Sequence, residues 1–292
     1  MPAPASPARR LHSLRALPFA FLILLLPPAA CVQPDREARD GTDESVGDPA
    51  RGLALLNAFP DSLPGYSGNG LTCTSCHLDN GTRKTALPWL GSAARYPRYR
   101  PRSGTEESMQ TRVNDCIERS LAGRSLPGDG QEMRDIVAYM EELANAPRPA
   151  DAEPLTVAGD PEEGREGYAL QCARCHGGSG EGINGLGPAV WGIDSYSIGA
   201  GMARQYTLAT FVRRNMPNDL PGSLGDREAA SIAAYVLTMP RQDYPPRNRD
   251  WPNADPPADV AYPTDAAKAA GLAVPALRPV LARRIPTDPP PP

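Results

Sequence analysis

Lysine and histidine are rare in this chain. Only two lysines, Lys84 and Lys268, and three histidines occur among its 292 residues. A surface that binds nucleic acid needs a stripe of positive charge, and a net charge of −4 does not supply one. The longest apolar run, eleven residues at 16–26, is too short for a helix that spans a bilayer. The charge therefore counts against a nucleic-acid-binding protein, and the length of the apolar run counts against a transmembrane helix.

Proline and glycine are abundant instead. The chain contains 35 prolines and 27 glycines, and 40% of its residues are hydrophobic. It can therefore build packed cores, but much of its backbone is irregular. Its length predicts about two domains, which this composition favours as small and loop-rich.

The N-terminus resembles an export signal. Residues 1–31 combine arginines, the apolar run and the segment "PPAAC", and we predict cleavage and a periplasmic location. The Arg9-Arg10 pair lacks the flanking pattern of a twin-arginine signal, so the general secretory route is favoured. Removing three arginines leaves 27 basic and 34 acidic residues, a net charge of −7. Cys31 resembles a lipoprotein attachment site, but Pro28 stands where such sites have leucine. A lipid anchor at Cys31 and a free periplasmic protein both remain open.

Four of the six cysteines occur in two pairs, each followed directly by histidine. The motifs are "CTSCH" at 73–77 and "CARCH" at 172–176. This pattern is the attachment signature of c-type haem: two cysteines bind the porphyrin and the histidine binds iron. A disulfide scaffold is the ordinary alternative for an exported chain. Zinc is disfavoured because the pairs are 99 residues apart. We predict two covalently bound c-type haems, held by Cys73, Cys76, His77, Cys172, Cys175 and His176.

The surroundings of the two motifs repeat as well. Short helices are expected at 48–59 and 160–170, and amphipathic helices at 131–143 and 225–239. The predicted fold is all-α: two tandem small cytochrome c domains of class I type, with extensive irregular loops. The expected parts are the signal peptide 1–31, a flexible segment 32–47, domain 1 at 48–146, a linker at 147–159, domain 2 at 160–245 and a proline-rich tail at 246–292. The tail is either disordered or wraps the domains as irregular chain.

Each iron needs a second axial ligand or an open site, and the two motifs use His77 and His176. In the second domain, Met202 and Met216 lie between the haem motif and the closing helix. Glycines around Met202 allow the backbone to approach the haem closely. Either methionine could serve as the ligand, while Met239 is expected in the core.

In the first domain the soft donors in the same interval are Met109 and Cys116. If residues 106–121 are helical, Arg112, Cys116 and Ser120 form one stripe along the helix. A thiolate beside Arg112 would have a lowered pKa and be available to iron or to an electrophile. A small buried hydrophobic residue is the other interpretation of Cys116. Spacing alone leaves both open.

Taken together, several motifs resemble those of the dihaem c-type thiosulfate dehydrogenases. They are "LTCTSCHLDNGTRKT", "YPRYRPRSG", "RVNDCIERSLAGRSLP", "GAGMARQYTLATFVRRNMP" and "DWPNADPPADVAYP". The resemblance as a whole extends over roughly residues 48–262. The first domain is also similar to the SoxA subunit of the sulfur-oxidising complex. A C-x-x-C-H motif occurs in all c-type cytochromes, and its combination with "RVNDCIERS" is far more specific.

The resemblance implies residue roles. The family's cysteine ligand of the active-site haem falls on Cys116, its substrate-site arginines on Arg102 and Arg112, and its site serine on Ser120. The distal ligand of the second haem falls on Met202. Some members have a lysine there that exchanges with methionine on reduction, and this chain has none at that site. His/Met ligation is therefore expected.

The implied reaction joins two thiosulfate ions into tetrathionate, with tetrathionate reduction as the reverse direction. Guanidinium groups suit two like-charged dianions, because each can hold a sulfonate by paired N–H donors. Electrons would pass from the first haem to the second, and then to a cytochrome c or a high-potential iron–sulfur protein. A dihaem electron carrier with Met109 as distal ligand and a SoxA-like subunit are the alternative functions.

Overall fold

The computed structural model describes residues 46–286 of the chain. The expected signal peptide with Cys31, the segment up to residue 45 and the last six residues lie outside this range. Within it, the chain is mostly helical and contains no helix long and apolar enough to cross a membrane.

The first haem domain contains four α-helices and a small hairpin. The helices are α1 (Pro49–Asn57), α2 (Phe59–Ser62), α3 (Met109–Arg119) and α4 (Gln131–Glu142), and the 3-10 helices are η1 (Cys73–Ser75) and η2 (Ala93–Arg95). Strands β1 (Arg98–Arg100) and β2 (Thr105–Glu107) pair antiparallel. The helix expected at 131–143 is confirmed as α4, and that expected at 48–59 is α1, which ends at Asn57. The helix expected at 106–121 is shorter than predicted: α3 begins at Met109, because Glu106 and Glu107 belong to strand β2, and ends at Arg119.

The second haem domain repeats the pattern without the hairpin. Its elements are α5 (Pro161–Gln171), α6 (Ala173–His176), η3 (Gly201–Ala203), α7 (Gln205–Asn215) and α8 (Asp226–Thr238). The helices expected at 160–170 and 225–239 are confirmed as α5 and α8.

The first helix of each domain starts at an Asp-Pro pair. The side chain of Asp48 accepts hydrogen bonds from the N–H groups of Ala50 and Arg51, and that of Asp160 accepts one from Glu162. The following proline occupies the first helical position, where no N–H is needed. The same local sequence therefore starts both domains in the same way.

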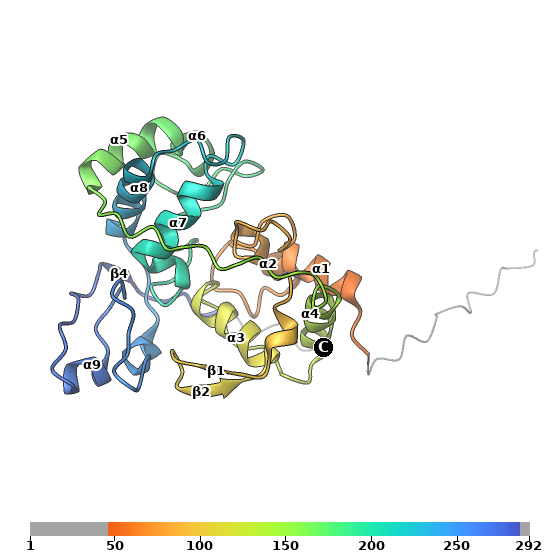
Figure 1. Ribbon diagram of the computed structural model, residues 1–292. Helices are drawn as coiled ribbons and strands as arrows, with labels where there is room; N and C mark the ends of the chain where they lie inside the picture. Colours follow the sequence, from red (N-terminus) through yellow and green to blue (C-terminus); the bar gives the residue numbers. More distant parts are fainter. Residues whose placement is uncertain (1–45, 287–292) are drawn as a thin grey trace, which may run out of the picture. The chain divides into compact units, whose positions relative to one another are not determined.

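Each domain is built on a pair of packed helices, α1 with α4 and α5 with α8 (Figure 1). A glycine allows the close approach in both pairs. A Cβ added to Gly52 would lie 2.0 Å from the carbonyl oxygen of Asp135, and one added to Gly164 would lie 1.9 Å from that of Ser231. Any larger residue would force the helices apart. The two helix pairs thus place their haem motifs in equivalent positions of the fold.

The described part of the proline-rich tail, residues 246–286, contains short elements of secondary structure. It contains η4 (Pro245–Arg249), α9 (Asp265–Ala269) and β4 (Val280–Leu281), which pairs parallel with β3 (Arg241–Gln242). Tyr262 is 1% exposed, and Asp250 and Asp259 are also buried. Of the two alternatives left open by the sequence, residues 246–286 follow the second and wrap the domains as irregular chain.

Candidate functional site

The first haem motif presents a fixed imidazole. His77 lies directly after Cys76, and its Nδ1 is 2.5 Å from the carbonyl oxygen of Leu87. Its ring stacks on Trp89 with a centroid distance of 4.7 Å. Burial lowers the pKa of His77 to about 4, so the ring is neutral at ordinary pH. Because Nδ1 donates to the carbonyl, Nε2 is left with the lone pair that an iron ligand needs.

The second motif repeats this arrangement. His176 Nδ1 is 2.7 Å from the carbonyl oxygen of Pro188, and burial lowers its pKa. Trp191 packs against Tyr168 at a centroid distance of 4.9 Å, and the Tyr168 hydroxyl donates to the carbonyl of Gly177. Both histidines are therefore oriented by a backbone acceptor that follows the motif in the sequence.

The motif cysteines form no disulfides, and the pKa is raised in three of them, Cys73, Cys76 and Cys172. Burial is the largest cause: it raises the pKa of Cys76 to about 12 and that of Cys172 to about 11. Within residues 46–286, no three His, Cys, Asp or Glu side chains group into a metal cage. Neutral thioether bonds to a porphyrin suit such a dry environment, and the residues fit a haem at each motif.

Two buried donors near the first motif have no partner in the described chain. They are Arg241 Nη1 and the Tyr196 hydroxyl, in side chains whose residues are 1% and 4% exposed. The Arg241 guanidinium lies over the Tyr196 ring, 4.4 Å from its centroid. Such donors need an acceptor when buried. The carboxylate of a haem propionate has the charge and size to supply it.

Helix α3 carries Cys116 towards the first haem motif. Val113 and Ile117, on the adjacent stripe, and Leu121 just after the helix are 7%, 1% and 3% exposed and anchor this segment in the core. The Cys116 thiol is close enough to Cys73 and Cys76 to raise the pKa of both, in addition to the larger effect of burial. The structure therefore brings Cys116 together with the cysteines of this motif.

Arg112 lies one turn before Cys116, on the same stripe. Cys116 is the largest cause of the raised pKa of Arg112, and the charge of Arg112 in turn lowers the pKa of His77. Its closest acid is Asp115, at 3.9 Å, a distance too long for a strong hydrogen bond. The guanidinium is therefore positively charged and weakly paired beside Cys116.

Arg102 is held very differently. Its Nε donates to Asp250 at 2.9 Å, and its Nη2 donates to Gly199 at 2.7 Å and lies 2.5 Å from the Tyr262 hydroxyl. It also stacks over the Trp251 ring at 4.9 Å. The expectation from the sequence treated Arg102 and Arg112 as equivalent, whereas most of the Arg102 guanidinium is already engaged by the C-terminal segment.

Ser120 is the C-cap of α3 and is partly buried. Its N–H donates to the carbonyl of Cys116, and its own carbonyl accepts from the Asn69 side chain. These backbone contacts close the helix just after Cys116. No hydrogen bond of the Ser120 hydroxyl occurs within the described chain.

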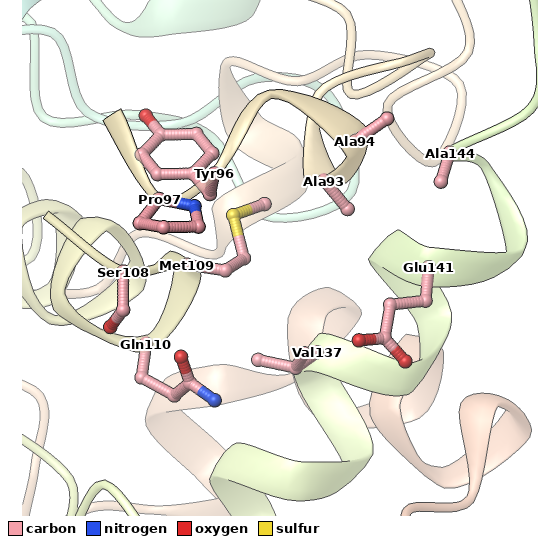
Figure 2. Close-up of a pocket in the computed structure, with 10 residues that line it drawn as sticks. All are labelled: Ala93, Ala94, Tyr96, Pro97, Ser108, Met109, Gln110, Val137, Glu141 and Ala144. Atoms are coloured by element: carbon pink, nitrogen blue, oxygen red, sulfur yellow. The ribbon is translucent and has the colours of Figure 1, made fainter. Parts of the chain in front are cut away.

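Met109, the other soft donor of the first domain, lies at the N-terminus of α3. It lines a cavity of about 350 Å³ with Tyr96, Val137 and Glu141. Figure 2 shows its side chain between Pro97 and Ala93. No residue of either C-x-x-C-H motif lines this cavity.

The two candidate methionines of the second domain lie on opposite ends of α7. Met202 is in η3, before the helix, and is 7% exposed. The next residue, Ala203, accepts a hydrogen bond from Arg278, which lies near Tyr196 and Arg241. Met216 is the C-cap of α7 and is partly buried. Three residues later, Asp219 pairs with Arg174 of the second haem motif at 2.6 Å.

The sequence did not indicate Asp250, Tyr262, Tyr196 or Arg241 as parts of the site. The one signal was the segment "DWPNADPPADVAYP", which contains Asp250 and Tyr262 and was noted without a role. These residues meet the first domain only through long-range folding.

Two helix pairs, each with a C-x-x-C-H motif and a histidine oriented for iron, define a dihaem c-type cytochrome. Comparison with known proteins agrees for both halves. Residues 66–146 match the family model "SoxA/TsdA, cytochrome c domain", and residues 159–236 match "cytochrome C oxidase, cbb3-type, subunit III". The protein carries two covalently bound c-type haems.

More specifically, the chain belongs to the thiosulfate dehydrogenase family. It is 40% identical over 224 residues to the thiosulfate dehydrogenase of Psychrobacter arcticus, covering 72% of this chain and 68% of the relative. It is 37% identical to that of Allochromatium vinosum, covering 75% and 85%. The solved thiosulfate dehydrogenase TsdBA of Marichromatium purpuratum is similar at 30% identity with a TM-score of 0.60. That match covers 65% of this chain and 45% of the other.

Proposed function

We propose that this protein is a thiosulfate dehydrogenase that joins two thiosulfate ions into tetrathionate at the first haem. The observation that carries the proposal is the grouping of the Cys116 thiol with the first haem motif and with the weakly paired Arg112. A plain electron carrier needs neither a thiol nor an unneutralised guanidinium at that position. Membership of the family supports the same activity.

Cys116 is proposed as the distal ligand of the first haem and as the sulfur that reacts. The Cys116 thiolate and one thiosulfate form an S–S bond and give up two electrons in doing so. A second thiosulfate then attacks this bond, which releases tetrathionate and restores the thiolate. Charge balances in both steps, and no proton is taken up or released. Bound haem supplies the electron acceptor, and an anionic sulfur ligand stabilises its oxidised state.

Arg112 is proposed to bind the sulfonate of thiosulfate. Its guanidinium has no strong acidic partner, so binding an anion does not require an existing ion pair to be broken. Arg102 is proposed to contribute mainly through its Nη1, since its other nitrogens are engaged. The Ser120 hydroxyl is a further donor at the end of the same stripe. The site thus offers positive charge where two dianions must meet.

Met216 is proposed as the distal ligand of the second haem, in place of the preferred Met202. The spacing within the chain supports this assignment, because Cys116 is 39 residues after His77 and Met216 is 40 after His176, whereas Met202 is 26 after it. Cys116 lies near the end of α3 and Met216 at the end of α7, the helices that precede α4 and α8. His/Met ligation gives the second haem the higher potential, so electrons flow towards it.

From the second haem, electrons are proposed to reach an external cytochrome c or high-potential iron–sulfur protein. The signal-like sequence at 1–31 supports export to the periplasm, with a lipid anchor at Cys31 as an additional proposal. The reverse reaction, tetrathionate reduction, uses the same site.

Purified holoprotein, thiosulfate and ferricyanide test the function directly. We expect tetrathionate to form with one ferricyanide reduced per thiosulfate consumed, without any other protein. Low-temperature electron paramagnetic resonance of the same sample should show a thiolate-ligated ferric haem. A protein that forms no tetrathionate alone but does so with a partner subunit would instead indicate a SoxA-like role. One with two His/Met signals and no turnover would be an electron carrier.

A further inference from the structure

The C-terminal segment places one buried carboxylate between two arginines of the first domain. Asp250, 4% exposed, accepts hydrogen bonds from Arg119 Nη1 at 2.8 Å, Arg119 Nη2 at 2.9 Å, Arg102 Nε at 2.9 Å and the Tyr262 hydroxyl at 2.6 Å. Both carboxylate oxygens are used. A paired, two-pronged contact of this kind fixes orientation as well as distance.

One of these arginines belongs to the helix that carries Cys116. Arg119 is the last residue of α3, three residues after Cys116, and is 7% exposed. It also donates to Asp115 at 3.1 Å and lies over the Tyr244 ring at 4.5 Å. Asp250 therefore holds the end of α3 from outside the helix, less than one turn from the reactive sulfur.

The other arginine belongs to the β1–β2 hairpin, and the same segment holds its tip. Trp251 N–H donates to the carbonyl of Arg102 at 2.8 Å, and the Asn253 side chain donates to the Tyr99 hydroxyl at 2.8 Å. The Pro252 ring packs on Gly104, where any Cβ would lie 2.4 Å away. Residues 251–253 thus contact the hairpin, while Asp250 binds both Arg102 of the hairpin and Arg119 of α3.

We propose that Asp250 is a positioning residue of the active site: its carboxylate fixes α3 and the hairpin relative to each other, and so sets the orientation of the Cys116 sulfur towards the first haem. The proposal rests on Cys116 being the distal ligand, as set out under Proposed function. Two guanidiniums share this carboxylate, and replacing it by an amide leaves Arg102 without an acidic partner and Arg119 with Asp115 alone. The two elements then separate, and α3 loses its fixed end.

The test compares Asp250→Asn with Asp259→Asn in the full-length holoprotein. Asp259 is a matched control, because it is an equally buried acid of the same segment that binds Arg204 and the N–H of Tyr206 in the second domain. The readouts are the paramagnetic resonance spectrum of ferric haem 1, its midpoint potential, and turnover with thiosulfate and ferricyanide. We expect Asp250→Asn to replace the single thiolate-type signal by several, to leave the haem 2 signal unchanged and to lower kcat at least tenfold. Asp259→Asn should leave the haem 1 signal as in wild type.

A folded Asp250→Asn protein with a wild-type haem 1 signal and wild-type turnover overturns the proposal. If this variant does not accumulate, Tyr262→Phe decides by the same readouts. It removes one hydrogen bond to Asp250 and one neighbour of Arg102, and a smaller change of the same kind is expected. An unchanged haem 1 signal in Tyr262→Phe would then count against the proposal. Failure of the proposed function itself is recognised earlier, since wild-type protein would lack a thiolate-type signal.

Discussion

The two haem domains share the structure that surrounds the haem-binding histidine. They differ in the residues proposed to lie on the other side of the haem. Both start at an Asp-Pro cap, cross their helices at a glycine and anchor a histidine Nδ1 on a backbone carbonyl. On the other side, the proposed residues are Cys116 and Arg112 within a helix of the first domain and Met216 at a helix end of the second. Haem attachment constrains the shared side, and the facing residue is free to determine whether the haem reacts or only transfers electrons.

The domains also differ in what covers them. In the first domain, residues 250–253 cover the β1–β2 hairpin, whose tip carries Arg102. Near the second motif, Leu170, Leu186 and Leu220 are 78%, 64% and 63% exposed. A reaction between like-charged ions benefits from exclusion of water, whereas electron exit needs a surface that another protein can approach. The first domain is therefore shielded where the reaction is proposed, and the second is exposed where electrons are proposed to leave.

The largest effect is expected from Cys116→Gly, which removes the proposed feature that distinguishes the first domain from the second. Without the sulfur, the first site has neither the distal ligand nor the reactive group, and turnover should fall by at least about 100-fold. Both haems should remain attached, as measured by the haem content of denatured protein. Cys116→Met is the matched variant: it should restore a six-coordinate haem with a raised potential but no turnover. Wild-type activity in Cys116→Gly would remove Cys116 from the mechanism.

The second-largest effect is expected from Met216→Ala, which should make the second haem a weaker electron acceptor. Loss of the thioether is expected to lower its potential by about 0.1 V or more, within the roughly 0.8 V that axial ligands span. Spectroelectrochemical titration and the methionine–iron charge-transfer band measure this directly. Met202→Ala is the control and should keep the band. The opposite result would return the ligand to Met202.

Arg112→Gln should weaken substrate binding while leaving both haem spectra intact. Losing one charge-assisted contact costs about 1.5–3 kcal/mol, so KM for thiosulfate should rise about 10–100-fold. Arg95→Gln removes the same charge from an exposed position of the first domain and serves as control. Equal effects of both variants on KM would show that only the overall charge matters.

The smallest effect concerns acid stability of the two helix pairs. In the first, the Asp135 carboxylate accepts from Arg51 and from the N–H of Asp48; in the second, the Ser231 hydroxyl accepts from the N–H of Asp160. The second pair also has a carboxylate contact, Glu163 with Arg227 and Ser231, but this ion pair is solvent-exposed and contributes little. Burial acts to raise the pKa of Asp135, but the hydrogen bonds prevail and lower it. Its stabilising effect is therefore complete above the unfolded pKa of about 3.9 and is lost as the pH falls below that value.

Hydrogen exchange of holoprotein between pH 6 and pH 3 can separate the two pairs. Amides of α1 and α4 should lose protection on acidification before those of α5 and α8. Asp135→Asn should cost the first pair about 1–3 kcal/mol and abolish the difference in pH dependence. Equal pH dependence in wild type would contradict the role of this carboxylate.

The sequence predicted the repeated frame well because that frame depends on local signals. Asp-Pro caps, the C-x-x-C-H motifs and the apolar periodicity of 131–143 each act within one or two helical turns. The stripe of Arg112 and Cys116 was predictable for the same reason, once residues 106–121 were taken as a helix. Their roles in binding and reaction stay predictions.

Interactions distant in sequence were beyond such reasoning. Asp250 meets Arg102 across 148 residues, and nothing near either residue signals the contact. The residues alone left Met202 and Met216 open, and the preference for Met202 came from the family resemblance. The order of helices α7 and α8 supports the proposal of Met216, and the choice between the two stays a prediction. Order in the tail was equally unreadable, since proline-rich composition suits both disorder and wrapping.

The hydrogen bonds of Asn215, the neighbour of Met216, bear on the rate of electron transfer between the two haems. Its side chain accepts from the hydroxyl of Thr85 at 2.7 Å and donates to the carbonyl of the same residue at 3.0 Å, eight residues beyond His77. The end of α7 is thus tied to the loop that follows the first attachment motif. Tunnelling between redox centres weakens steeply with separation, and a tether at this point keeps that separation constant. Internal transfer should then run at one rate, unaffected by the arrival or departure of an outside acceptor.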